Sequence, residues 1–85
     1  MQVDFHNHFR KQYKKLSMKI KEKFNERLIV FKNNPFTSEL NNHTLHGKYS
    51  GCRSINVTGD IRAIYEVREK GVRFLDIDTH SNLYK

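Results

Sequence analysis

The sequence predicts an α+β domain in which an N-terminal strand and a two-helix hairpin pack on a mostly antiparallel, four-stranded sheet. Two periodic patterns of apolar residues support this class. Apolar residues recur at helical spacing between residues 6 and 34, and they alternate with polar residues, as strands require, between residues 52 and 78. A chain of 85 residues has the length of one domain, so residues 1–85 are expected to fold as a single unit.

The first third of the chain predicts a strand followed by two helices. "MQVDF" at 1–5 alternates apolar and polar residues, which indicates a short strand. Helical spacing then relates Phe9, Tyr13 and Leu16, and Ser17 is a candidate N-cap for the next helix. The stripe of that second helix consists of Ile20, Phe24, Leu28 and Phe31. Pro35 ends it, because proline disfavours helical backbone in the residue before it.

The rest of the chain predicts a loop and then three strands joined by hairpins. Residues 37–51 have the composition of a loop, with Gly47 and Gly51 as breaks. Alternation predicts strands at 52–57, 61–67 and 72–78. "TGD" at 58–60 is a hairpin signal in which Gly59 is expected to take a positive φ.

Positive charge is concentrated in the N-terminal third. The chain has 16 Lys and Arg against 9 Asp and Glu, a net charge of +7. Residues 1–34 hold nine basic and three acidic residues (net +6), whereas residues 35–85 hold seven and six (net +1). This clustering favours a polyanion such as RNA as partner over an ordinary solvated helix surface. The lysines expected to contact RNA are Lys14, Lys15, Lys19 and Lys23.

Several classes of protein are disfavoured. Cys52 is the single cysteine, so no intramolecular disulfide can form. No apolar run has the length of a transmembrane helix, and the N-terminus has no signal-peptide core, so we expect a cytoplasmic protein without a membrane partner. The H-x-x-H spacing of His43 and His46 supplies two ligands where zinc needs three or four, so no metal or cofactor is expected.

Polar side chains gather on the predicted hairpin strands and the C-terminal tail. Each has an ordinary explanation by itself, since an Asp in a turn or an Arg in a strand is usually only solvated. Their presence in the same half of a basic domain favours a shared site. The set consists of His43, His46, Lys48, Arg53, Asn56, Asp60, Arg62, His80 and Tyr84.

Three segments of this half follow one another in a recognisable order. They are "HTLHGKYSGCRS" at 43–54, "GDIRAIYEV" at 59–67 and "DTHSNLY" at 78–84. The first is similar to an H-x-L-x-G-x-(aromatic)-x-G-(aromatic)-R element, the second to an R-x-(I/V)-Y-x-V strand, and the third to a T-H-x-x-L-F ending. On these motifs, residues 41–85 resemble the RelE/ParE toxin superfamily, and most closely the YafQ-type branch of bacterial type II toxin–antitoxin systems.

The resemblance implies a RelE-like fold and a toxin that cleaves messenger RNA on the ribosome, in the 30S A site, without a metal. In that reaction the ribose 2′-OH attacks the adjacent phosphorus and leaves a cyclic phosphate and a 5′-OH. It needs a base, an acid, cations for the phosphorane charge and a group that stacks on a nucleobase. Carried over by position, the catalytic residues are His43, Asp60, Arg62, His80 and Tyr84.

Two roles in proton transfer follow from the resemblance. His80 is expected to be the general acid, because an imidazole can give or take a proton near neutral pH. The base is expected to be His43 or Asp60, and His46 stays open as a third possibility.

The other expected contacts are with phosphate and nucleobase. Arg62 and Arg53 are expected to hold the scissile phosphate, since a planar guanidinium can grip it at two points. Tyr84 is expected to stack on a base or orient the sugar. Further RNA contacts are expected from His46, Lys48 and Asn56.

The sequence departs from the branch at three positions and leaves alternatives open. Asn56 stands where the branch has a histidine, and Ile61 and Cys52 stand where it has aromatics. Asn56 cannot transfer a proton, which keeps open a catalytically weak member that only binds antitoxin or RNA. A ParE-like inhibitor of DNA gyrase is the other alternative, although such proteins generally lack the His, Asp, Arg and Tyr set. The resemblance also implies a cognate antitoxin protein as partner.

Overall fold

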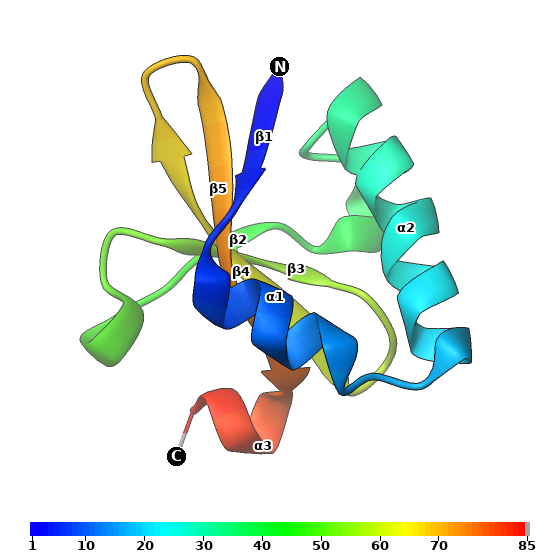
Figure 1. The fold of residues 1–85 in the computed structure, drawn as a ribbon. Helices are drawn as coiled ribbons and strands as arrows, with labels where there is room; N and C mark the ends of the chain where they lie inside the picture. Colours follow the sequence, from blue (N-terminus) through cyan, green and yellow to red (C-terminus); the bar gives the residue numbers. More distant parts are fainter. Residues whose placement is uncertain (85) are drawn as a thin grey trace.

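In the computed structural model, which describes residues 1–84, two helices pack against one face of a five-stranded sheet (Figure 1). The elements in chain order are β1 (Gln2–Phe5), α1 (Asn7–Lys14), α2 (Met18–Asn33), β2 (His43–Thr44), β3 (Arg53–Asn56), β4 (Ile61–Arg68), β5 (Gly71–Thr79) and α3 (His80–Leu83). Two 3₁₀ turns, η1 (Ser38–Leu40) and η2 (Gly47–Tyr49), lie between α2 and β3. The predicted α+β class is confirmed.

The strand order is β1-β5-β4-β3-β2, with β1 parallel to β5 and every other pair antiparallel. The expected count of four strands is wrong by one, because β2 lies inside the segment that was predicted as loop. In β2, His43 pairs with Ser54 and Thr44 with Arg53. A strand of two exposed polar residues shows no alternation, so its sequence carries no strand signal.

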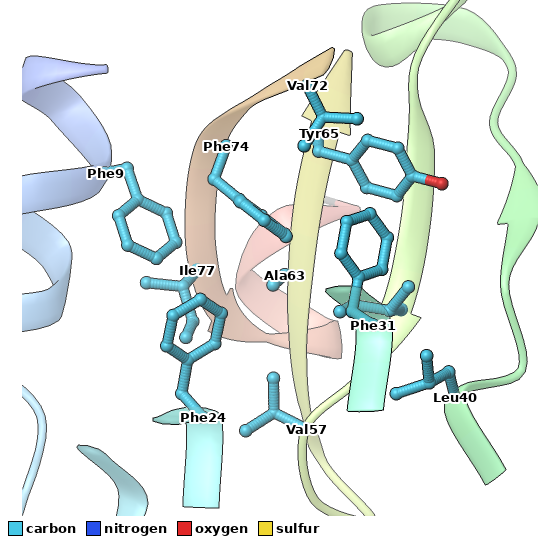
Figure 2. Close-up of a cluster of buried hydrophobic side chains, with 11 residues drawn as sticks. Phe9, Phe24, Phe31, Leu40, Val57, Ala63, Tyr65, Val72, Phe74 and Ile77 are labelled. Atoms are coloured by element: carbon cyan, nitrogen blue, oxygen red, sulfur yellow. The ribbon is translucent and has the colours of Figure 1, made fainter. Parts of the chain in front are cut away.

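Aromatic rings form most of the core between the sheet and the helices (Figure 2). Phe74 of β5 lies at its centre and is fully buried. Its ring centroid is 5.5–5.9 Å from those of Phe5, Phe9, Phe24, Phe31 and Tyr65. Stacked, tilted and edge-on pairs at such distances stabilise a core beyond the apolar area that they bury.

Side-chain caps begin both long helices. The Ser17 hydroxyl accepts a hydrogen bond from the Ile20 N–H at 3.2 Å, which confirms the predicted N-cap. The His6 Nδ1 accepts one from the His8 N–H at 3.0 Å and so caps α1. None of the helices within residues 1–84 has the length and apolarity needed to cross a membrane.

The β3–β4 hairpin closes differently from the expectation. Gly59 does not take a positive φ; among the described glycines, Gly47 (+66°) and Gly51 (+89°) do. Instead, the Thr58 hydroxyl accepts hydrogen bonds from the backbone N–H groups of Asp60 (3.2 Å) and Ile61 (2.9 Å). The Thr58 side chain therefore satisfies the backbone N–H groups of the turn, and the turn does not need a residue with positive φ.

Candidate functional site

The sheet face opposite the aromatic core carries three of the predicted site residues, His43, Asn56 and Arg62. Directly opposed residues in antiparallel strands share a face, so the register defines rows across it. One row contains His43, Ser54, Ile64 and Asp76, and the next contains Asn56, Arg62 and Asp78. The intervening row, Ile55, Ala63 and Ile77, belongs to the core on the helical side.

The C-terminal tail folds back beneath this face as α3 (Figure 1). The Thr79 hydroxyl caps the helix by accepting a hydrogen bond from the Asn82 N–H at 3.1 Å. Leu83 is buried against Leu45 and Ile64 in a small second cluster. The His80 N–H donates to the Asp60 carbonyl oxygen at 2.9 Å. The tail is thus fixed to the sheet and to the β3–β4 turn.

His80 and Tyr84 form a contacting pair on this tail. Their ring centroids are 4.7 Å apart and the rings are tilted by 59°. Both side chains and that of Asp60 are exposed. An imidazole, a phenol and a carboxylate consequently reach solvent at the same end of the sheet.

Arg62 brings a cation to this end. One guanidinium nitrogen donates to the backbone carbonyl oxygens of Thr58 and Gly59, each at 3.0 Å, so the side chain lies over the turn. These acceptors are neutral, and within residues 1–84 no carboxylate lies in ion-pair contact with Arg62. Its charge is therefore available to an incoming anion.

His43 is held in one tautomer by its neighbour. Its Nδ1 lies 2.8 Å from the Asn41 carbonyl oxygen. A carbonyl oxygen can only accept, so Nδ1 carries the proton, and in the neutral ring Nε2 is left as an acceptor. The exposed ring can therefore take up a proton at Nε2.

Two buried polar atoms on the same face have no protein partner among residues 1–84. They are the Ser54 hydroxyl and the side-chain amide oxygen (Oδ1) of Asn56. Ser54, which the sequence did not single out, is fully buried next to His43 in the register. Such atoms are uncommon in folded proteins and normally meet water or a ligand.

Arg53 does not join this set. It lies opposite Tyr65, a core residue, on the helical face of the sheet. Its Nε donates to the Asn42 side-chain oxygen at 2.7 Å, and its guanidinium carbon lies 5.2 Å from the centre of the Phe36 ring. The structure does not bring Arg53 and Arg62 together, because the two side chains start from opposite faces of the sheet, and their joint contact with one phosphate stays a prediction.

The remaining predicted RNA contacts lie in two places. His46 and Lys48 are exposed around η2, next to the sheet face described above. Lys14, Lys15 and Lys19 are exposed in the helical layer. Lys23, in the same layer, is half-buried and pairs with Glu26 at 3.8 Å.

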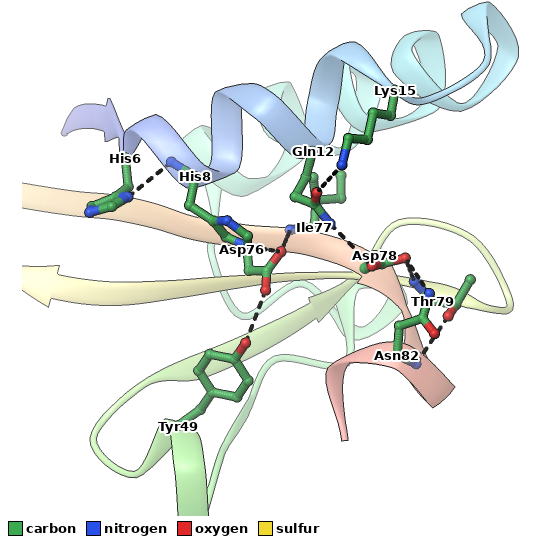
Figure 3. A network of polar contacts seen from close by, with 10 residues as sticks. All are labelled: His6, His8, Gln12, Lys15, Tyr49, Asp76, Ile77, Asp78, Thr79 and Asn82. Carbon is green, nitrogen blue, oxygen red and sulfur yellow. Dashed lines mark hydrogen bonds and ion pairs between the residues drawn. The ribbon is translucent and has the colours of Figure 1, made fainter. Parts of the chain in front are cut away.

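The sequence did not reveal the polar network along β5 (Figure 3). Asp76 is 7 % exposed; its Oδ2 accepts from the Tyr49 hydroxyl at 2.9 Å, and its Oδ1 lies 3.2 Å from the His8 Nε2. Burial, followed by the hydrogen bond to Asp76 and the charge of that carboxylate, raises the pKa of Tyr49 to about 12. Tyr49 therefore stays protonated and donates at neutral pH.

Cys52 has the surroundings of an unreactive residue. Burial, and secondarily the charge of Glu66, raises the pKa of the Cys52 thiol. A thiol with a raised pKa is a poor nucleophile at neutral pH.

Within residues 1–84, no three His, Cys, Asp or Glu side chains gather closely enough to hold a metal ion.

A small basic domain with helices on one sheet face and His, Asp, Arg and Tyr side chains on the other has the architecture of a RelE/ParE-type toxin. A family model described as "Bacterial toxin of type II toxin-antitoxin system, YafQ" matches residues 1–85. The chain therefore belongs to the YafQ family of type II toxins, and the match extends the resemblance to the N-terminal helices.

Solved structures share the fold over nearly the whole chain. YafQ from E. coli strain BL21(DE3) is 24% identical, with 99% of this chain and 98% of that chain covered and a TM-score of 0.83. The YoeB/ParE toxin from Agrobacterium tumefaciens is 21% identical, with 94% and 99% covered and a TM-score of 0.77. YafQ in the E. coli DinJ–YafQ complex is 24% identical, with 99% and 98% covered and a TM-score of 0.72. A search of curated proteins finds no match.

Proposed function

We propose that this toxin is an endoribonuclease that cleaves messenger RNA on the ribosome and thereby inhibits translation in the cytoplasm. The observation that carries the proposal is the contact of His80 with Tyr84 at the end of the sheet where Asp60 and Arg62 also lie. An acid, a cation and a stacking ring are three of the four groups that attack by a ribose 2′-OH requires. His43, at the edge of the same sheet face, supplies the fourth.

Proton transfer would run between two histidines. His43 Nε2 takes the proton of the 2′-OH as the O2′–P bond forms, and the hydrogen bond from its Nδ1 to Asn41 supports this orientation. The P–O5′ bond then breaks, and His80 gives its proton to the leaving O5′. The products are a cyclic phosphate and a 5′-OH. Asp60 stays an alternative base, because it is exposed beside His80.

Two groups would act on the phosphate and the nucleobase. The Arg62 charge stabilises the phosphorane, where negative charge increases during the attack. Tyr84 stacks on a base that has been turned out of the message, as aromatic side chains do in single-stranded RNA recognition. Its 38 % exposure leaves ring surface for this contact.

Induction of the chain in bacteria, followed by primer extension on an abundant message, tests the proposal. We expect growth arrest with new 5′ ends inside the translated region, and no such ends when the start codon of that message is removed. Growth arrest with gyrase-linked DNA breaks and an intact message would instead identify a ParE-like inhibitor. A folded chain that causes no arrest would be a catalytically weak family member, as Asn56 allows.

The exposed lysines of the helical layer are proposed to bind ribosomal RNA. Changing Lys14, Lys15 and Lys19 together to Gln should weaken ribosome binding and reduce the slope of log affinity against log salt by about 2–3, since each phosphate contact contributes about 0.7–0.9. Filter binding over a range of KCl concentrations measures this. Lys70→Gln, on the exposed turn between β4 and β5 and outside the helical layer, is the control. An unchanged slope in the triple variant would contradict the proposal.

A cognate antitoxin is proposed as the second partner. E. coli YafQ has been solved in complex with DinJ, and YoeB of Staphylococcus aureus with YefM. In this chain, a groove of about 580 Å³ between α1 and α2 is lined by apolar side chains such as Phe5, Phe9 and Tyr13, and by Arg10 and Lys14. Apolar walls with cationic members suit an acidic amphipathic helix of the antitoxin.

Charge reversal in this groove tests the antitoxin proposal. Arg10→Glu should weaken the binding of the acidic protein encoded beside the toxin at least about tenfold, because a like charge then faces the acidic helix. Isothermal titration calorimetry measures the affinity, and Lys70→Glu, on the exposed β4–β5 turn, is the matched control. Equal affinities for the two variants would place the antitoxin elsewhere.

A further inference from the structure

Two carboxylates of β5 connect α1 to two parts of the proposed site, η2 and α3 (Figure 3). Asp76 contacts His8 of α1 and Tyr49 of η2, at 3.2 and 2.9 Å. Asp78 accepts hydrogen bonds from Gln12 of α1 and from Asn82 of α3, each at 3.1 Å. His8 and Gln12 are four residues apart and therefore lie on one face of α1.

The first bridge anchors the segment that carries His46 and Lys48. That segment contains two glycines with positive φ, Gly47 and Gly51, and its backbone hydrogen bonds are local, from the Ser50 N–H to the Gly47 carbonyl oxygen and from the Cys52 N–H to the Tyr49 carbonyl oxygen. The Tyr49 hydroxyl ties it to a strand 27 residues away. Asp76 also accepts the Ile77 N–H at 2.8 Å, so the anchoring carboxylate is itself fixed.

The second bridge anchors the helix that carries His80 and Tyr84. α3 has only four residues, and Leu83 is its buried member. The hydrogen bond from the Asn82 side chain to the Asp78 Oδ1 limits rotation of α3 about that contact. Asp78 is held in place by the Thr79 N–H at 2.7 Å and by Gln12.

We propose that Tyr49 and Asn82 are positioning residues of the RNA-cleaving site, each held by a β5 carboxylate that is also bonded to α1. Tyr49 orients the segment with His46 and Lys48 for RNA binding, and Asn82 orients His80 for proton transfer. A site whose supporting hydrogen bonds are removed loses its pre-organised geometry, although the reacting groups are still present. This inference rests on the proposed endoribonuclease function.

The two positions predict opposite kinetic signatures on ribosomes programmed with a defined message. Tyr49→Phe should raise KM about tenfold with kcat nearly unchanged, because it loosens a binding segment. Asn82→Ala should lower kcat about tenfold with KM nearly unchanged, because it misorients the acid. Thr37→Val, which removes a hydroxyl bonded to the Asn34 carbonyl oxygen outside the site, and Ser81→Ala, on the exposed side of α3, are the controls.

A measurement without turnover complements the kinetics. Amide order parameters of residues 46–51 should fall in Tyr49→Phe and stay at wild-type values in Thr37→Val. Should Tyr49→Phe fail to fold, Asn82→Ala tests the proposal alone, because Asn82 is exposed and the cap at Thr79 uses its backbone.

The outcomes separate this inference from the function on which it rests. If the wild-type toxin cuts translated message and both variants match it in KM and kcat, the positioning roles are wrong and the function stands. If the wild-type toxin does not cut, the proposed function fails and this inference fails with it. A loss of kcat in the Ser81→Ala control as large as that in Asn82→Ala would also overturn this inference.

Discussion

Replacing His80 with alanine is expected to slow messenger RNA cleavage about 10²–10⁴-fold, the contribution typical of a positioned general acid. Without the imidazole, the leaving O5′ must take its proton from water. The fold should survive, because the His80 side chain is exposed and its backbone N–H keeps the bond to Asp60. Alanine also suits the first turn of α3.

Single-turnover cleavage on programmed ribosomes measures this effect. Ser81→Ala, one residue further along the same exposed helix, should cut at the wild-type rate. Circular dichroism and the unfolding midpoint of both variants check that α3 and the sheet persist. A His80→Ala rate within twofold of wild type would remove His80 from the mechanism.

Phe74→Ala is expected to destabilise the domain by about 3–5 kcal/mol, the range for truncating a buried phenylalanine. Phe74 contacts five other rings at the centre of the core, so the surrounding side chains cannot readily fill the space (Figure 2). Small domains have a total stability of about 5–15 kcal/mol, so this loss should remove a large part of the stability of the domain.

Urea denaturation followed by circular dichroism tests the expected loss, and Phe74→Leu gives a folded variant if the alanine variant cannot be purified. Val67→Ala is the matched control, because Val67 is 68 % exposed on the adjacent strand β4 and should change stability by less than about 0.5 kcal/mol. Similar unfolding midpoints for Phe74→Ala and Val67→Ala would show that the aromatic cluster does not dominate stability.

The helices and the long strands could be predicted because their signals are local. The Ser17 cap, the Phe24 and Phe31 stripe and the alternation in β3 and β4 are each contained in one element. β2 could not be predicted, because two residues show no period, and it forms only through pairing with Arg53 and Ser54. The four-residue helix α3 likewise depends on Leu83 meeting Leu45 and Ile64, which are far away in sequence.

Asp76 was missed because a β-bulge changes the register of β5. Strict alternation would place Asp76 on the same face as Phe74, inside the aromatic core. The irregularity at Ile64/Tyr65 pairs Phe74 with Tyr65 but Asp76 with Ile64, so Leu75 is the extra residue and Asp76 turns to the site face. Its partner His8 is also 68 positions away, a contact that no local pattern indicates.

For Arg53, by contrast, the sheet face could be predicted from the sequence. In an extended strand, Arg53 shares a face with Ile55 and Val57, which follow it at every second position, and both of these are core residues in the structure. By the same alternation, Arg62 lies on the face opposite that of Ala63 and Tyr65, which are also core residues. The prediction that both arginines hold one phosphate followed from the resemblance alone. It did not take into account that successive side chains of a strand point to opposite faces of the sheet, which separates Arg53 from Arg62.

The chemistry of the cut ends tests the central claim most directly, because it reports the reaction itself. A message translated in the presence of the purified toxin should yield new 5′ ends that carry a hydroxyl, and upstream fragments that end in a 2′,3′-cyclic phosphate. The same message without a start codon should stay intact. New ends that carry a 5′-phosphate, or no new ends at all from a folded toxin, would contradict the assignment of an attack by the 2′-OH at the site around His80.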